Sequence, residues 1–161
     1  MKPLRLLALT ALLALVSGCD RGSQPRMIGS PAPDFTIRDA DRTVSLHDFH
    51  GKIIILNFWE SWCLPCIEET PSMIRLHERM PQVVILGVST ESDDRAYHKF
   101  LIDQHVNYLT VRDGSRHSSD LYGTTGQPET FIIDAAGIVR RKFAGPEDWT
   151  SPAIIDYLNK L

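Results

Sequence analysis

The sequence has few cysteines and no second group of metal-ligating residues. Three cysteines occur among 161 residues, and apart from the C-x-x-C of Cys63 and Cys66 there is no other C-x-x-C and no H-x-x-x-H. A structural zinc site needs two further Cys or His ligands at regular spacing. Structural zinc is therefore poorly supported, and we expect neither a metal nor another cofactor.

The sequence also lacks an excess of positive charge and any internal repeat. Its 17 Lys and Arg are outnumbered by 20 Asp and Glu, which gives a net charge of −3. Domains that bind nucleic acid carry basic faces, so a nucleic-acid partner is not expected. The length fits one ordinary domain with its own core, and we expect it to be a monomer.

No apolar run is long enough to span a bilayer as a permanent helix. The leucine- and alanine-rich stretch 6–16 follows Lys2 and Arg5 and ends in small residues before Cys19. This arrangement is typical of a signal peptide, which we predict over residues 1–18, with an uncleaved N-terminal anchor as the alternative. Both place the folded part in an oxidising compartment outside the cytoplasm.

The stretch V-S-G-C at the end of this signal resembles a bacterial lipobox. The resemblance implies that Cys19 is lipidated, and several acyl chains would anchor the protein firmly to a membrane. Asp20 resembles the signal that retains lipoproteins at the inner membrane, so we expect the periplasmic side of that membrane. The polar segment 19–33 is predicted to be a flexible tether, and residues 34–161 to be the folded domain.

The C-x-x-C lies where a strand gives way to a helix. Residues 53–58, I-I-I-L-N-F, are typical of a central strand covered on both faces. After Cys66, apolar residues recur at helical spacing as far as Pro81. Cys63 is thus expected at a helix N-terminus, where free N–H groups and the helix dipole favour a thiolate. We predict that Cys63 attacks disulfides and that the more buried Cys66 resolves the mixed disulfide.

The rest of the pattern predicts alternating strands and helices. A hairpin at 35–37 and 43–46 precedes the strand at 53–59 and the helix at 63–80. Ser151 is predicted to be the N-cap of the last helix. The other expected elements are strands at 83–89, 108–111, 131–134 and 138–144 and helices at 93–104, 117–122 and 152–158. This order predicts an α/β sandwich around a mixed sheet.

Together, these features resemble the thioredoxin superfamily and, within it, the membrane-tethered TlpA/ResA/CcmG (DsbE) type of thiol-disulfide oxidoreductase. The signature N-F-W-x-x-W-C-x-P-C at 57–66 carries the resemblance. It implies a thioredoxin-like three-layer sandwich, with a mixed central sheet flanked by helices, an N-terminal β-hairpin and a helix-strand insert at 91–112. It also implies that Trp59, Trp62 and Pro65 support the active site.

A second signature, G-Q-P-E-T-F-I-I-D at 126–134, matches the family pattern G-x-P-x-T-F-x-x-D. By resemblance, Pro128 is a cis-proline that faces the dithiol. The main-chain groups of Gln127 would remain free to pair with an extended substrate segment. We expect Gln127, Leu64 and Glu129 to contact the substrate. The residues on either side of the proline depart from the usual family pattern, which affects the choice of substrate.

Glu69, three residues after Cys66, falls where this branch of the family keeps a carboxylate. Ordinary thioredoxins have a buried acid at the position of Asn57. If it is partly buried near two thiols, Glu69 has a raised pKa and can take the proton from Cys66. A solvated carboxylate in the first helical turn is the alternative. We predict Glu69 as the third catalytic residue.

The direction of electron flow depends on which redox form the surroundings stabilise. Strong oxidants of this fold carry a histidine between the cysteines, whereas this chain has Leu64 and Pro65, and no neighbouring cation is expected. Nearby carboxylates would disfavour a thiolate at Cys63. The carboxylates expected there are Glu60, Glu68, Glu69 and Glu129. The sequence therefore predicts a protein-disulfide reductase.

The resemblance also implies partners. The substrates would be disulfide-bearing proteins, such as the haem-attachment C-x-x-C-H of apocytochrome c. A reductant in an oxidising compartment must be supplied with electrons, which implies a membrane donor of the DsbD/CcdA kind.

Two alternative functions stay open. A thiol peroxidase of the same fold would use a P-x-x-x-T-x-x-C setting, which is absent. A copper-handling lipoprotein would combine the dithiol with a histidine. The histidines, which show no ligand spacing, are His47, His50, His77, His98, His105 and His117.

Overall fold

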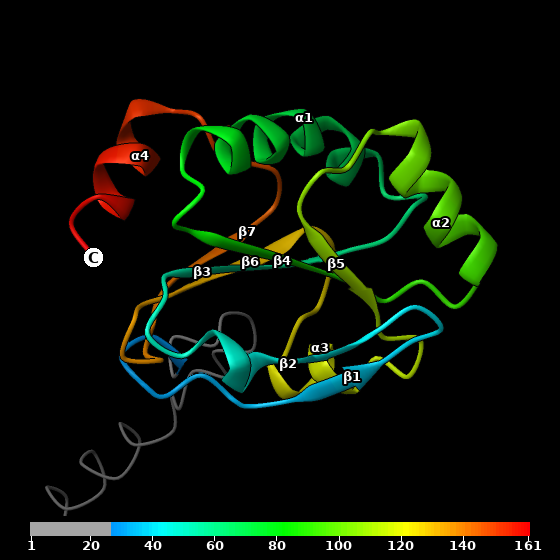
Figure 1. Cartoon of the computed structure of the whole chain (residues 1–161), viewed down its shortest axis with the longest axis horizontal. Helices are drawn as coiled ribbons and strands as arrows, with labels where there is room; N and C mark the ends of the chain where they lie inside the picture. Colours follow the sequence, from blue (N-terminus) through cyan, green and yellow to red (C-terminus); the bar gives the residue numbers. More distant parts are fainter. Residues whose placement is uncertain (1–26) are drawn as a thin grey trace, which may run out of the picture.

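A five-stranded mixed sheet forms the centre of the molecule in the computed structural model, which describes residues 27–161 (Figure 1). In spatial order the strands are β5 (Leu109–Arg112), β4 (Val84–Ser89), β3 (Ile54–Trp59), β6 (Glu129–Ile133) and β7 (Val139–Ala144). The pairs β5·β4 and β4·β3 are parallel, and β3·β6 and β6·β7 are antiparallel. The predicted signal peptide 1–18 and the lipidation of Cys19 lie outside the described residues.

Different elements cover the two faces of the sheet (Figure 1). One face carries the helices α1 (Leu64–Arg79), α2 (Asp94–Asp103) and α4 (Pro152–Leu158). The other face carries the hairpin β1 (Thr36–Arg38) and β2 (Thr43–Ser45), the short 3₁₀ helix η2 (Leu46–Phe49) and α3 (His117–Leu121). The predicted three-layer sandwich, with its hairpin and its helix-strand insert α2–β5, is confirmed.

Strand β3 shows how the sequence specifies these layers. Successive side chains of a strand point to opposite faces of the sheet. Leu56 and Phe58 therefore join the core cluster under the hairpin, whereas Ile55 joins the cluster beneath α1 and α4. All six residues of β3 are buried, which explains why Asn57 is the single polar residue in its sequence.

A third, smaller core cluster surrounds the end of β3. Trp59 packs there with Tyr97 and Phe100 of α2 and with Cys63 and Cys66. The ring centroids of Trp59 and Phe100 are 4.3 Å apart. The inserted helix thus provides the apolar cover beside the dithiol.

The observed elements differ from the expected ones mainly at their ends. Strand β6 begins at Glu129, two residues before its predicted start. Ser151 occupies the N-cap of α4, but its side chain makes no capping hydrogen bond. The folded part begins before residue 34, because the N–H of Gly29 donates to the carbonyl of Val139 over 2.7 Å and Pro31 bridges Ile138. Among residues 27–161, no helix is both long and apolar enough to cross a membrane.

Gly87 of β4 leaves room for the Trp59 side chain. A Cβ atom at this position would lie 3.0 Å from Nε1 of Trp59 and 3.2 Å from Cγ2 of Thr110. We predict that Gly87→Ala lowers the free energy of unfolding by about 1–3 kcal/mol, because overpacking a filled core forces its neighbours to shift. Urea unfolding of the oxidised protein measures this change.

Gly126→Ala is the matched control, because a Cβ atom at Gly126 would meet nothing within 4 Å. Its stability should stay within a few tenths of a kcal/mol of the parent or rise slightly. Equal stability of the two alanine variants would show that the close packing at Gly87 is without energetic consequence.

Candidate active site

Cys63 and Cys66 form a disulfide at the junction of β3 and α1, with their Cα atoms 5.2 Å apart. Cys63 is the N-cap residue of α1, and its Sγ accepts a hydrogen bond from the Cys66 N–H at 3.2 Å. Its own N–H donates to the carbonyl of Glu60 at 3.2 Å. After reduction, this N–H donor and the helix dipole favour a thiolate at Cys63.

The two cysteines differ in their access to solvent. Cys63 is 5% exposed and Cys66 is 1% exposed, so only the first reaches the surface, and only by a small area in the disulfide form. Trp62 and Leu64, on either side of Cys63, are both largely exposed. Pro65 lies in the first turn of α1, where a proline costs no helical hydrogen bond.

Trp59 and Trp62 have opposite environments, although both were expected to support the site. Trp59 is buried against α2, and its Nε1 has no hydrogen-bond partner among the described residues. Trp62 borders a pocket of about 290 Å³ between α1 and α2, with Ile67 and Phe100 also in its lining. Trp59 therefore belongs to the core, whereas Trp62 belongs to the surface around Cys63.

Glu69 is buried one turn of α1 after Cys66 and makes three hydrogen bonds. Its Oε1 accepts from Asn57 Nδ2 at 2.8 Å, and its Oε2 accepts from Trp149 Nε1 at 3.2 Å and from the Glu147 N–H at 3.4 Å. Burial raises the pKa of Glu69 to about 7, although the three donors oppose the rise. The alternative of a solvated first-turn carboxylate is wrong.

Residues three apart on one helix lie on the same face, with Cβ atoms about 5–6 Å from each other. Glu69 and Cys66 are related in this way on α1, and both are buried. Asn57 of β3 also donates to Thr130 Oγ1 of β6 at 2.8 Å. The acid is thus connected through Asn57 to the two central strands.

The Gln127–Pro128 peptide bond is cis, as predicted. Because Glu129 pairs with Phe58, the β3·β6 register places Gln127 and Pro128 beside the end of β3 at Trp59. The main-chain N–H and C=O of Gln127 have no hydrogen-bond partner among residues 27–161. The side chain of Gln127 donates from Nε2 to Thr90 Oγ1 at 3.2 Å.

Glu129, which was expected to contact the substrate, is buried in the structure. Its Oε2 forms an ion pair with Lys142 Nζ at 2.7 Å, and its Oε1 accepts from the N–H and the hydroxyl of Thr125 at 3.2 Å each. A role in substrate binding stays a prediction for Glu129. The carboxylate has partners within the fold, and it is not displayed at the surface.

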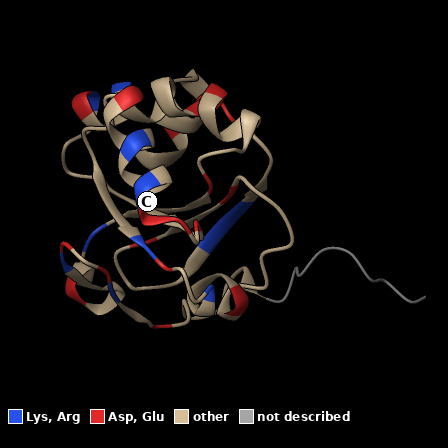
Figure 2. Cartoon of the chain, turned by 90° about the vertical axis from the view of Figure 1, so that its right-hand side faces the viewer, with Lys and Arg blue, Asp and Glu red and all other residues tan. Residues whose placement is uncertain are grey.

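The structure brings a cation to the side chain of Glu60, in the turn that carries the dithiol. Arg116 Nη1 pairs with Oε1 of the buried Glu60 at 2.8 Å, and Glu60 is the residue whose carbonyl holds the Cys63 N–H. Neither the Arg116–Glu60 pair nor the Lys142–Glu129 pair could be predicted from the sequence, because the two residues of each pair are not neighbours in the chain. Figure 2 shows that acidic and basic residues lie on both sides of the sheet, so charge of neither sign is confined to one face.

A second pocket, of about 330 Å³, lies between α1 and the loop from Pro146 to Asp148. Glu69, Ser72 and Arg75 line it from the helix. Trp149 N–H donates to Ser72 Oγ at 3.1 Å and closes this loop over α1. Trp149 was missed by sequence reasoning, since a lone tryptophan in a C-terminal loop shows no pattern that relates it to Glu69.

In residues 27–161, no group of three or more His, Cys, Asp or Glu side chains has the arrangement of a metal site. A disulfide at a helix N-terminus, a buried acid one turn behind it and a cis-proline beside the same strand end define a thiol-disulfide oxidoreductase of thioredoxin fold.

Comparison with known proteins gives the same class. Residues 28–142 match the AhpC/TSA family. A thiol:disulfide interchange protein DsbE of Pseudomonas fluorescens biotype C is 38% identical over 126 residues, which cover 76% of this chain and 70% of that protein. The thiol-disulfide oxidoreductase ResA of Bacillus subtilis (strain 168) is 35% identical over 136 residues, which cover 83% of this chain and 75% of that protein.

A solved structure shows the same fold. The crystal structure of a putative thiol:disulfide interchange protein DsbE from Chlorobium tepidum matches with a TM-score of 0.73 at 28% identity, over 83% of this chain and 93% of that chain. The chain belongs to the AhpC/TSA family of thioredoxin-fold proteins. Within it, the protein is a protein-disulfide oxidoreductase of the DsbE/ResA type, which confirms the predicted resemblance.

The raised pKa of Glu69 predicts a specific dependence of stability on pH. The folded protein holds the Glu69 proton up to about pH 7, whereas the unfolded chain releases it near 4.5. The unfolded state therefore binds fewer protons in this window, and stability falls as pH rises through it. We expect the free energy of unfolding of the oxidised protein to lose about 2 kcal/mol between pH 5 and pH 8 through this group.

Urea unfolding at several pH values, compared between the parent and Glu69→Gln, isolates this contribution. The glutamine cannot ionise, so the difference in stability between the two proteins should change across the window. Its amide would face donors such as Asn57 Nδ2, which adds an offset that does not vary with pH. A difference that stays constant from pH 5 to pH 8 would contradict the assignment.

Proposed function

We propose that this protein reduces disulfide bonds in other proteins outside the cytoplasm, with Cys63 as the attacking and Cys66 as the resolving cysteine. The observation that carries the proposal is the Cys63–Cys66 disulfide at the N-terminus of α1, with the buried Glu69 one helical turn behind it. The relatives named thiol:disulfide interchange protein and thiol-disulfide oxidoreductase support the same chemistry.

The reaction begins with the reduced protein. The Cys63 thiolate attacks one sulfur of the substrate disulfide, and the other substrate sulfur leaves as a thiolate. Cys66 then loses its proton and attacks Sγ of Cys63. This second step breaks the mixed disulfide, releases the remaining substrate thiolate and leaves the Cys63–Cys66 bond. Two electrons have passed to the substrate, and the protein is in the oxidised form of the structure.

Glu69 is suited to the second step. A base is effective when its pKa lies near the working pH, and burial raises the pKa of Glu69 to about 7. The acid lies on the same face of α1 as Cys66, so a proton can pass between them directly or through one water. Glu69 thus acts as proton acceptor for Cys66 during resolution.

The substrate docks around the exposed side of Cys63. Trp62 and Leu64 present apolar surface there, and the free main-chain groups of Gln127 can pair with an extended segment by strand addition. Main-chain pairing tolerates different sequences, and the apolar side chains select among them.

The proposal that the protein acts as a reductant depends on negative charge near Cys63, and two of the carboxylates expected there are neutralised in the structure. Glu60 and Glu129 are matched by Arg116 and Lys142, so their charges largely cancel. Near the dithiol turn, the carboxylates without a cation among the described residues are Glu68, Glu69 and Glu91, of which Glu91 accepts from Ser61 of this turn, and they oppose a further negative charge. The residues between the cysteines, Leu64 and Pro65, are neutral.

The cellular setting follows from the sequence beyond the described residues. We propose a lipid anchor at Cys19 on the periplasmic side of the inner membrane. We also propose disulfides such as the C-x-x-C-H of apocytochrome c as substrates, and a membrane electron donor of the DsbD/CcdA kind.

Trapping the mixed disulfide tests the proposed roles. Without the resolving sulfur, Cys66→Ala should retain its substrate as a covalent mixed disulfide on Cys63. Purification from cells, non-reducing electrophoresis and mass spectrometry would identify the partner and the linked residue. Cys63→Ala is the matched control and should trap nothing.

Linkage through Cys66 in the control, and no linkage through Cys63, would reverse the assigned roles. Rapid consumption of peroxide by Cys66→Ser would instead favour the thiol peroxidase. Copper that co-purifies with the anaerobically isolated protein would favour the copper-handling alternative.

The reduction potential tests the direction. We expect a value far below the roughly −120 mV of a strong oxidant such as DsbA, closer to the roughly −270 mV of thioredoxin. Equilibration with glutathione or dithiothreitol buffers, followed by alkylation and mass analysis, measures it. A value near −120 mV would assign the protein as an oxidant while leaving its cysteine chemistry intact.

A further inference from the structure

The inference concerns Arg116, which neither the proposed reaction nor the family signatures use. Arg116 precedes α3 and forms an ion pair at 2.8 Å with Glu60, which lies in the turn between β3 and the dithiol. The carbonyl of Glu60 accepts a hydrogen bond from the Cys63 N–H, so Glu60 contacts both Arg116 and the attacking cysteine.

Glu60 is deeply buried, with a side chain 5% exposed, whereas that of Arg116 is 49% exposed. Burying a carboxylate without a counter-charge is costly. Thr90 Oγ1 donates to the same Oε1 at 2.5 Å. Glu60 is therefore held by one neutral and one cationic donor.

The hydrogen bonds continue from Glu60 to the cis-proline loop. Thr90 Oγ1 also accepts from Gln127 Nε2 at 3.2 Å, and Gln127 immediately precedes the cis bond. The chain Arg116–Glu60–Thr90–Gln127 therefore connects four loops at one end of the sheet, namely the β3–α1 turn and the β4–α2, β5–α3 and α3–β6 loops.

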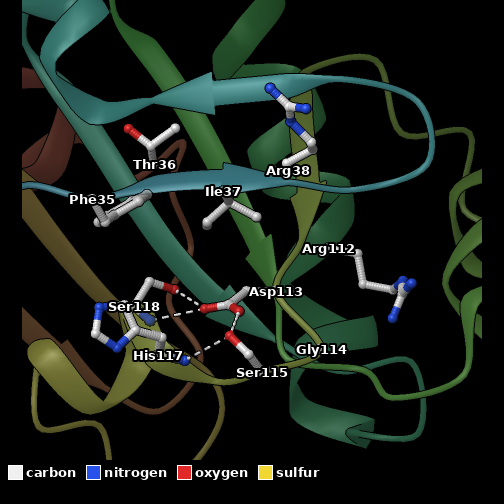
Figure 3. A pocket seen from close by; sticks show the side chains of 10 residues that line it. All are labelled: Phe35, Thr36, Ile37, Arg38, Arg112, Asp113, Gly114, Ser115, His117 and Ser118. Carbon is white, nitrogen blue, oxygen red and sulfur yellow. Dashed lines mark hydrogen bonds between the residues drawn. The ribbon is translucent and has the colours of Figure 1, made fainter.

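The loop that carries Arg116 is rigidly built (Figure 3). Asp113 accepts hydrogen bonds from the Ser115 hydroxyl at 2.5 Å and from the N–H and hydroxyl of Ser118 at 2.8 Å and 2.6 Å. The main chain of Arg116 is held at both ends, since its N–H donates to the Asp113 carbonyl and its own carbonyl accepts from Ser119 Oγ. These bonds fix the main chain of Arg116, and its side chain pairs with Glu60.

Arg116 has a left-handed backbone with φ of 62°. This conformation is unfavourable for a residue with a side chain and costs glycine almost nothing. An arginine at this position therefore needs a compensating interaction, and the ion pair with the buried Glu60 is the interaction that the structure provides.

We propose that Arg116 is a positioning residue for the dithiol. Its guanidinium group neutralises the buried Glu60 carboxylate, so that no uncompensated negative charge from this residue lies beside Cys63. The same ion pair belongs to the hydrogen-bond chain that joins the dithiol turn to the cis-proline loop. The inference rests on the proposed function in taking Cys63 as the attacking cysteine. The other charged groups at this end of the sheet include Glu68, Glu69 and Glu91, the Glu129–Lys142 ion pair and Asp113. Glu91 accepts from Ser61 Oγ at 2.6 Å, so the dithiol turn contacts a second carboxylate.

Arg116→Gly is the most informative variant, because glycine suits the left-handed backbone and removes only the side chain. The freed Glu60 carboxylate then disfavours a thiolate beside it. We expect the titration midpoint of the Cys63 thiolate to rise by about 0.5–1 unit, and alkylation of Cys63 at pH 7 to slow by roughly three- to tenfold. Thiolate absorbance and alkylation kinetics of the reduced protein measure both.

Three companion variants separate charge from structure. Arg116→Lys keeps the cation and should restore most of the parent behaviour. The double variant Arg116→Gly with Glu60→Gln removes both charges and should return the midpoint close to the parent value. Arg140→Ala breaks a comparable pair with Asp134, whose side-chain exposures are 45% and 9%, and should leave Cys63 unchanged.

Equal midpoints in Arg116→Gly and the parent would overturn the inference. So would a double variant that behaves like the single one, because the effect would then be structural and not electrostatic. Both measurements use a small alkylating reagent on the isolated protein, so they do not depend on the identity of the substrate. Failure of the substrate trap would refute the proposed function and leave the result on Arg116 standing.

Discussion

The short turn between β3 and α1 is the constraint on which the rest of the site depends. Strand β3 ends at Trp59 and α1 begins at Leu64, so four residues must reverse the chain and bring one sulfur to the helix cap. The Cys63 N–H bonds to the Glu60 carbonyl, and the Thr90 N–H bonds to that of Trp59. The parallel ladder with β4 and the packing of α1 on the sheet hold both ends of the turn.

Glu60, Glu69 and Glu129 are buried carboxylates around this turn, and they have different partners. Glu60 and Glu129 form ion pairs with Arg116 and Lys142. Among the described residues, Glu69 has three neutral donors and no cation, so burial dominates and raises its pKa to about 7. Here, Glu69 is the carboxylate that can exchange a proton near neutral pH.

The sequence predicted the features that depend on neighbouring residues. The apolar run of β3, the C-x-x-C and the helical spacing after Cys66 defined the fold and the dithiol. The Gln127–Pro128 signature located the cis bond. These features could be predicted because strand, helix and turn preferences act over a few residues.

What could not be predicted is the set of partners that long-range packing supplies. Arg116 lies 56 residues from Glu60 and Trp149 lies 80 residues from Glu69, and neither has a local pattern that relates it to its acid. The expected charge around the dithiol was incomplete for the same reason, since it counted carboxylates in the sequence without the cations that the fold brings to Glu60 and Glu129. The register of β6 against β3 and β7 gave Glu129 its position beside Lys142.

The pocket of about 330 Å³ beside Glu69 has a consequence for turnover. It lies between α1 and the loop from Pro146 to Asp148, whereas Trp62 borders a different pocket between α1 and α2. A protein partner that covers Cys63 and Trp62 therefore leaves a separate opening to bulk solvent. Through this opening Glu69 can exchange its proton with bulk solvent while the surface around Cys63 is occupied.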